Sequence, residues 1–179
     1  MIYLFLANGF EEIEAITTVD ILRRAGCELV TVGVGGKKVT GGHGIEITAD
    51  IDEKEAKTDS LDMIILPGGM PGTLNLEKST IVKAAIHYCA ENDKYIAAIC
   101  AAPSILGHMN LLTEHTATCF PGYEQELNAK EVSSDFVCVS GRIITAKGAG
   151  VTVDFALKIV EVLCGSQKSI MLRKSIQCM

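Results

Sequence analysis

The pattern of apolar and polar positions alternates between two kinds of segment along this chain. Short continuous runs of Ile, Val and Leu are typical of strands buried on both faces, and longer amphipathic segments are typical of helices. The apolar runs predict strands at Ile2–Leu6, Glu28–Val34, Met63–Leu66, Tyr95–Ile99, Phe136–Val139 and Ile143–Thr145. The amphipathic segments predict helices at Glu12–Ala25, Ser79–Glu91, Ala102–Met109 and Val151–Cys164. The pattern therefore indicates repeated strand–helix units.

Repeated strand–helix units predict an α/β fold, with a mostly parallel sheet and helices on both faces. Gly26 and Gly165 follow the first and the last predicted helix and end them. The turn Ser140-Gly141-Arg142 separates the last two strands as in a hairpin. The length suits one core, and we find no linker, low-complexity tract or internal repeat. We expect a single domain over residues 1–179.

Charge and composition argue against several classes of partner. The net charge is −6, and the basic residues form no cluster larger than Arg23-Arg24, so a nucleic-acid backbone or an anionic membrane is not an expected partner. The N-terminal apolar run lacks the basic start of a secretory signal. The apolar window Tyr95–Leu112 contains Pro103 and His108, which suit a turn and a helix better than a membrane span. We expect a cytoplasmic protein that binds neither nucleic acid nor membranes.

One of the seven cysteines stands apart by its position. In a reducing compartment most free cysteines are small buried side chains, and the irregular spacing here contains no Cys-x-x-Cys pair, so we expect no metal site. Cys100 ends the strand Tyr95–Ile99, and small residues follow where a helix starts. This position exposes a side chain as in a nucleophile elbow, and a helix N-terminus favours thiolate. We expect Cys100 to be nucleophilic, with a pKa below that of a free thiol.

Two further segments supply candidate partners for Cys100. Gly68 and Gly69 follow another strand, where glycines can expose backbone N–H groups to a ligand or an oxyanion. Glu14 lies in the first turn of the first helix, near its apolar stripe. A partly buried carboxyl there would hold its proton more easily and could exchange it with a thiolate. The ordinary alternatives are a tight turn for the two glycines and, for Glu14, a surface acid that complements the helix dipole.

Three segments together resemble the DJ-1/ThiJ/PfpI superfamily, in its DJ-1-like branch: Gly9–Glu14, Leu66–Gly69 and Ala97–Pro103. The resemblance implies a flavodoxin-like three-layer sandwich that forms a homodimer and uses no cofactor. It implies that Cys100 is the reactive, oxidation-prone cysteine and that Glu14 hydrogen-bonds to it. It also implies that the N–H groups of Gly69 and Ala101 form an oxyanion-type pocket beside Gly68.

The chain departs from the family pattern near the cysteine. Several DJ-1-like proteins carry a histidine before a proline, where this chain has Phe120. An aromatic ring then lines the pocket at the position of a possible base, and Glu14 is left as the main group for proton transfer. Arg24 matches a family arginine, for which a pocket role and a surface ion pair remain open. His43 stands where a family arginine lines the pocket.

The resemblance implies two functions of different classes. The first is a cysteine-dependent glyoxalase or deglycase that acts on small α-oxoaldehydes or glycated adducts and protects against oxidative stress. Cys100 would add to the aldehyde, and Glu14 would move the proton. The second is a redox sensor or chaperone-like protein that signals through a Cys100 sulfinate and needs no base.

Overall fold

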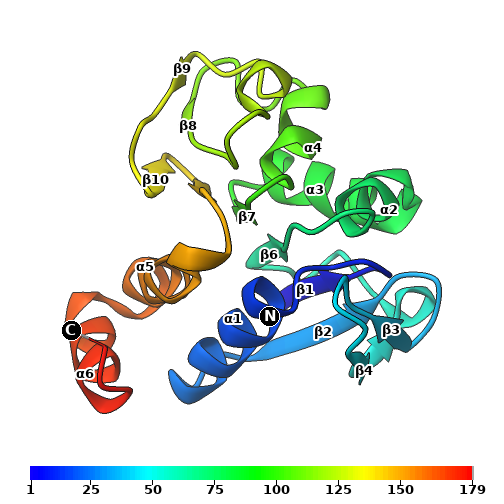
Figure 1. Ribbon diagram of the computed structural model, residues 1–179, viewed down its shortest axis with the longest axis horizontal. Helices are drawn as coiled ribbons and strands as arrows, with labels where there is room; N and C mark the ends of the chain where they lie inside the picture. The colour runs from blue at the N-terminus through cyan, green and yellow to red at the C-terminus, as the bar shows by residue number, and fades with distance from the viewer. Residues whose placement is uncertain (179) are drawn as a thin grey trace.

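A seven-stranded sheet forms the centre of the computed structural model, which describes residues 1–178 (Figure 1). The strand order is β10-β11-β7-β6-β1-β2-β5. All neighbours pair in parallel except the edge strand β10, which runs antiparallel to β11 as the predicted hairpin requires. The strands are β1 Ile2–Leu6, β2 Leu29–Gly33, β5 Ile51–Asp52, β6 Met63–Leu66, β7 Tyr95–Ile99, β10 Val137–Ser140 and β11 Ile143–Ala146.

Helices cover both faces of this sheet, which confirms the predicted three-layer α/β architecture. One layer contains α1 (Glu12–Arg24), α5 (Thr152–Cys164) and α6 (Ser166–Ser175), whose apolar residues share one core cluster. The other contains α2 (Gly72–Lys78), α3 (Thr80–Glu91) and α4 (Pro103–His108), whose apolar residues share a second cluster.

The residues of β1 show why both layers are needed. Ile2, Leu4 and Leu6 point into the cluster under α1 and α5, and Tyr3 and Phe5 point into the cluster under α3 and α4. Successive side chains of a strand alternate between faces, so a strand that is apolar throughout must be covered twice.

Some elements carry too weak a pattern to be predicted. The hairpin of β3 (Lys38–Thr40) and β4 (Glu46–Thr48) and the pair β8 (Thr116–Ala117) and β9 (Glu131–Val132) are only two or three residues per strand. Helices α2 and α6 were also not predicted, because the first is short and the second is mostly polar. Three short 3-10 turns complete the described residues, at Glu53–Glu55, Glu124–Glu126 and Ala149–Val151. The last of these moves the start of α5 to Thr152.

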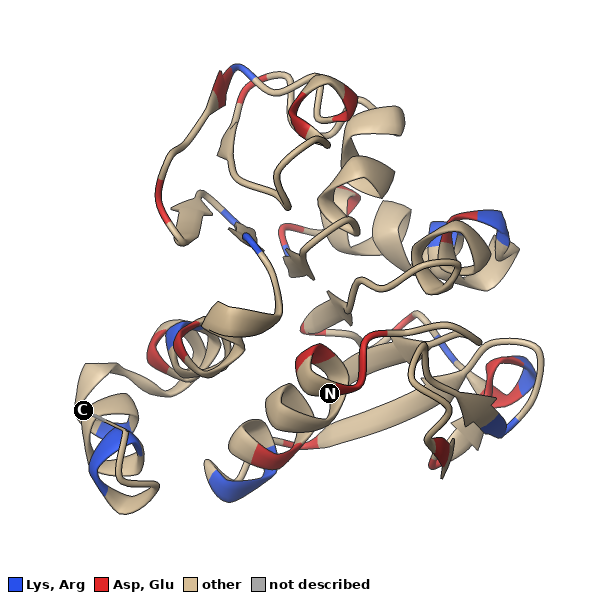
Figure 2. Cartoon of the chain, viewed as in Figure 1, with Lys and Arg blue, Asp and Glu red and all other residues tan. Residues whose placement is uncertain are grey.

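Helix α1 connects the two ends of the sheet and carries charges that match its dipole. Glu12 and Glu14 lie in its first turn and Arg23 and Arg24 in its last, as the red and blue segments show (Figure 2). Its first turn follows the carboxyl end of β1, where parallel α/β sheets place their sites. None of the helices within residues 1–178 combines the length and apolar character needed to cross a membrane.

We predict that truncating Phe155 destabilises the fold by about 3–5 kcal/mol, because its ring is 0% exposed in the cluster between α5 and the sheet. Phe136→Ala is the matched control, since that ring is 67% exposed and pairs with the Lys147 ammonium in a cation–π contact. Phe136→Ala should lower the free energy of unfolding by about 1 kcal/mol or less. Urea denaturation of both variants measures the two free energies of unfolding, and equal losses would contradict the assigned core.

Candidate active site around Cys100

Cys100 occupies the turn between β7 and α4 in a strained backbone conformation. Its φ is +65°, in the left-handed region that costs a side-chain-bearing residue about 1–3 kcal/mol. Two backbone hydrogen bonds hold it there: its N–H donates to the Ala146 carbonyl at 2.9 Å, and its carbonyl accepts from the Phe120 N–H at 2.8 Å. The thiol is therefore turned out of the sheet at the carboxyl edge and is partly exposed.

Glu14 brings a buried carboxyl to the same point. The residue is 1% exposed, and its Oε2 accepts a hydrogen bond from the Gly68 N–H at 2.7 Å. Its Oε1 is buried without a hydrogen-bond partner. Burial raises the pKa of this carboxyl to about 7, although the Gly68 N–H and the Cys100 thiol favour its charged form. Glu14 can therefore both give and take a proton near neutral pH.

The two glycines after β6 allow these side chains to approach. A Cβ on Gly68 would lie 2.6 Å from the Cβ of Cys100 and 2.8 Å from the Oε2 of Glu14, so no larger residue fits. Gly69 adopts φ +89°, and a Cβ there would collide with the Glu11 N–H. The glycine pair therefore brings the β6 loop against both the start of α1 and Cys100.

The Cys100 thiol and the Glu14 carboxyl titrate as a pair. Burial and the negative charge of Glu14 raise the pKa of the thiol to about 12, and the N–H groups of Ala101 and Gly69 lower it. The expected low thiol pKa is therefore wrong while Glu14 is ionised, because burial beside an acid outweighs the helix N-terminus. A protonated Glu14 exerts no such charge and can donate to the sulfur. Between about pH 7 and pH 12 the pair holds one proton, which either group can carry.

Phe120 and Gly148 lie beside the sulfur. A Cβ on Gly148 would lie 3.1 Å from the Phe120 ring and 3.9 Å from Cys100 Sγ, so the ring, the glycine and the thiol are neighbours. Phe120 is thus placed where the sequence predicts an aromatic wall. Two histidines bond elsewhere: His108 to acidic side chains, and His115 to Ser140 Oγ at 3.1 Å.

Comparison with known proteins identifies the family. The DJ-1/PfpI family model matches residues 1–162. This chain belongs to the DJ-1/PfpI family. It is 34% identical over 166 residues to Protein dj-1beta of Drosophila melanogaster, covering 91% of this chain and 89% of the fly protein. It is also 34% identical over 168 residues to the glutathione-independent glyoxalase DJR-1.2 of Caenorhabditis elegans, covering 93% and 89%.

Solved structures confirm the flavodoxin-like sandwich of this DJ-1/PfpI protein. Oxidised Toxoplasma gondii DJ-1 matches it with a TM-score of 0.95 and 31% identity, covering 98% of this chain and 97% of that one. Drosophila melanogaster DJ-1beta matches with a TM-score of 0.95 and 31% identity, covering 99% and 97%. Identities at this level over nearly the whole chain confirm the resemblance seen in the sequence.

The sequence offered Arg24 as a pocket residue, but in the structure of this DJ-1/PfpI protein it lies away from Cys100. It lies in the last turn of α1, ten residues from Glu14, and its Nε bonds to Asp20 at 2.7 Å on the surface. A helix rises about 1.5 Å per residue, so about 15 Å separates the two positions. Of the two roles left open, the surface ion pair is the one observed.

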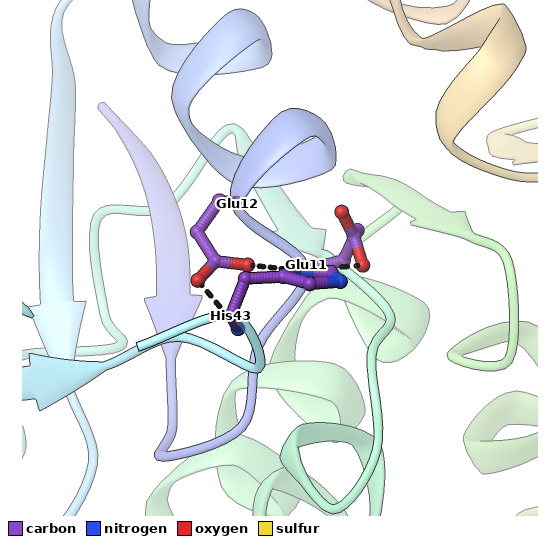
Figure 3. A group of neighbouring side chains, drawn as sticks. All are labelled: Glu11, Glu12 and His43. Carbon is purple, nitrogen blue, oxygen red and sulfur yellow. Dashed lines mark hydrogen bonds and ion pairs between the residues drawn. The ribbon is translucent and has the colours of Figure 1, made fainter. Parts of the chain in front are cut away.

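His43 takes part in a polar cluster next to the site. His43 Nδ1 lies 2.9 Å from Glu12 Oε2 and 3.8 Å from Glu11 Oε2, and Figure 3 shows both carboxylates facing the ring. Among residues 1–178, these three side chains form the group whose spacing could hold a metal ion, with ligand atoms within 4.8 Å of one another. The sequence predicts no metal site. Hydrogen bonds between Glu12 and His43 are sufficient to hold these side chains close together.

Glu12 has a structural role that the sequence pattern did not predict. This buried carboxylate accepts from the His43 N–H at 2.8 Å, and Gly41 leaves room for it. Burial opposes its ionisation, but hydrogen bonds from His43 keep the pKa of Glu12 below its usual value. Glu12 therefore holds the β3–β4 loop against the helix turn that carries Glu14. The adjacent Gly41-Gly42 pair was the available signal of this close approach.

We predict that Glu14→Gln removes a pH dependence of stability. The folded pKa of about 7 lies above the ordinary 4.5, so the folded state keeps a proton that the unfolded state loses. The stabilisation is fully present below about pH 4.5 and is lost as the pH rises through 7, by about 3 kcal/mol in total. Between pH 5 and 8 the wild type should lose stability relative to Glu14→Gln.

Urea denaturation across this pH range measures the difference. Cys100→Ser retains the buried carboxyl and should keep the wild-type slope. Parallel stability curves for the wild type and Glu14→Gln would contradict the shifted carboxyl pKa.

Proposed function

We propose that this protein is a cofactor-independent glyoxalase- or deglycase-type enzyme that acts on small α-oxoaldehydes or glycated adducts. The observation that carries the proposal is a buried carboxyl with a pKa of about 7 beside a cysteine whose sulfur faces two backbone N–H groups. The nematode relative named as a glutathione-independent glyoxalase supports it. Protection against reactive carbonyls under oxidative stress follows from such an activity.

Each step of the proposed reaction uses a group at the site. The Cys100 sulfur adds to the aldehyde carbon, and the oxygen takes a proton to give a hemithioacetal. The N–H groups of Gly69 and Ala101 are placed to bind the developing alkoxide. Ionised Glu14 removes the proton from C1 and returns it to C2, and the hydroxyl proton on the C1 oxygen passes to the C2 oxygen, which converts the hemithioacetal to a thioester. Water then cleaves the thioester, so methylglyoxal and water become lactate and the thiol is restored.

Phe120 sets an expected limit on the rate. The ring stands beside the sulfur but can neither accept nor donate a proton. Glu14 must therefore perform every proton transfer. A positioned acid or base contributes about two to four orders of magnitude, so we expect turnover to be slow but measurable.

A redox-sensor role is the second candidate, favoured by one observation. The sulfur is partly exposed and is surrounded by the Gly69 and Ala101 N–H groups and by a carboxyl that can be protonated. These donors suit the oxygens of a Cys100 sulfinate. Such a protein would signal or act as a chaperone without turnover.

Our prediction for activity is lactate formation from methylglyoxal without glutathione, measured with lactate dehydrogenase. Cys100→Ser should abolish it, because the nucleophile is gone. Glu14→Ala should lower kcat by roughly 10²–10⁴-fold, because the proton relay is gone. Phe120→His should raise the rate by placing a base at the sulfur.

Thr113→Ala removes an exposed hydroxyl that lies beyond the end of α4 and bonds to the Asn110 carbonyl, and it is the control for handling and purity. An absence of lactate at every pH, together with clean conversion of Cys100 to the sulfinate by mild peroxide, would favour the sensor role and overturn the enzymatic one.

We also propose that the protein is a cytoplasmic homodimer. Its seven cysteines are unbridged, which suits a reducing compartment. Ile13 and Ile16 are exposed on α1, and exposed Ile45 is the last residue of the β3–β4 loop that Glu12 holds against this helix. An apolar surface of this kind fits a self-complementary twofold contact.

The dimer predicts a light-scattering mass of twice 19.1 kDa at micromolar concentration. Ile13→Asp should shift the mass to the monomer value, because the contact would bury an unpaired charge. Ile170→Asp alters an equally exposed isoleucine on α6 and should leave the mass unchanged. A monomer mass for the wild type would refute the dimer.

A further inference from the structure

Two cysteines outside the Cys100 site lie side by side at the other end of the molecule. The Sγ atoms of Cys27 and Cys164 are 3.7 Å apart, although 137 residues separate them in the sequence. Cys27 follows α1, and Cys164 is the last residue of α5. These two helices pack against each other in the same layer (Figure 1).

A glycine helix cap fixes the position of each cysteine. Gly26 adopts φ +79° after α1, and the Cys27 N–H turns back to donate to the Leu22 carbonyl at 3.0 Å. This is the bond that closes a Schellman motif. Gly165 adopts φ +88° after α5, and its N–H donates to the Glu161 carbonyl at 2.9 Å. The approach of the two sulfurs is therefore built into the ends of two packed helices.

Small oxidants can reach the pair. Cys164 is exposed, and Cys27 is half-buried at the edge of a surface hollow of about 520 Å³ that also borders Leu163. Burial and the neighbouring Cys164 raise the pKa of the Cys27 thiol to about 11, while Lys168 opposes this shift. The exposed sulfur is accordingly the better first target of an oxidant, and the half-buried one is placed to attack it.

We propose that Cys27 and Cys164 form a disulfide when the protein meets a hydroperoxide. The Cys164 sulfur attacks the O–O bond, which gives a sulfenic acid and releases the hydroperoxide's other oxygen as water or an alcohol. The Cys27 sulfur then displaces the hydroxyl group from the sulfenic sulfur, and the thiol proton leaves with it as water. Two thiols lose two electrons and two protons, and the peroxide bond receives them. The sulfurs must approach by about 1.7 Å to reach bonding distance.

The bond would lock α1 to α5 away from the catalytic edge. Cys27 lies just before β2 begins, at the amino edge of the sheet, whereas Cys100 lies after β7 ends, at the carboxyl edge. A cross-link between residues this far apart in the sequence restricts the unfolded chain strongly. The oxidised protein would therefore keep its fold better under the conditions that oxidise Cys100.

The test treats the purified full-length protein with hydrogen peroxide, blocks free thiols with N-ethylmaleimide and maps tryptic peptides. We expect a disulfide between peptides 25–37 and 159–168, each of which contains one cysteine. The melting temperature of the oxidised wild type should rise by roughly 5–15 °C and return on reduction with dithiothreitol. Cys27→Ser and Cys164→Ser should each lose the cross-link and the rise.

Two matched variants separate this proposal from the activity of Cys100. Cys100→Ser should form the cross-link as the wild type does, whatever becomes of its glyoxalase activity. Cys178→Ser removes another partly exposed thiol near the C-terminus and should also retain it. Recovery of Cys27 and Cys164 as alkylated thiols while Cys100 is oxidised would overturn the proposal. Cross-links that join two chains, or that use Cys178, would overturn it as well.

Discussion

The contact between the buried Glu14 carboxyl and the Cys100 thiol is the constraint on which the rest of the site depends. Taking a carboxyl out of water disfavours its charge, and hydrogen bonds from the Gly68 N–H and the Cys100 thiol compensate only in part. Its pKa consequently rises to about 7, where one carboxyl can act as acid and as base. A more exposed Glu14 would be a permanent anion that repels the thiolate, and the proposed chemistry would lose its proton carrier.

Several locally unfavourable features of the fold maintain this contact. Cys100 adopts a left-handed backbone conformation, and Gly68 leaves no room for a side chain. Glu12 is buried as a second carboxylate and holds the neighbouring loop in place. Strained or polar groups of this kind persist only where the surrounding structure determines them. Here the parallel sheet does so, since the carboxyl ends of β1, β6 and β7 meet at one edge.

The layer formed by α1 and α5 links the two ends of the molecule. At the carboxyl edge, α1 supplies Glu14, and the turn before α5 supplies Gly148 beside the sulfur. At the amino edge, the same helices end at Cys27 and Cys164. In our two proposals, the same pair of helices borders the Cys100 site at one edge of the sheet and carries the second pair of cysteines at the other. The Cys100 site suits addition to carbonyls or oxidation to an acid, and the second pair suits a reversible cross-link.

The sequence by itself determined the elements whose signal is local. Continuous apolar runs predicted β1, β6 and β7 at their observed bounds, and the small residues around Cys100 indicated its turn. Family motifs then brought Glu14, Gly69 and Ala101 to the same site. Only the tertiary structure decided the proton balance of that site, because the pKa of a thiol depends on burial and on charges from other segments. For the same reason it alone brought Cys27 to Cys164: this distance arises from the packing of α1 against α5, which no local pattern of residues records.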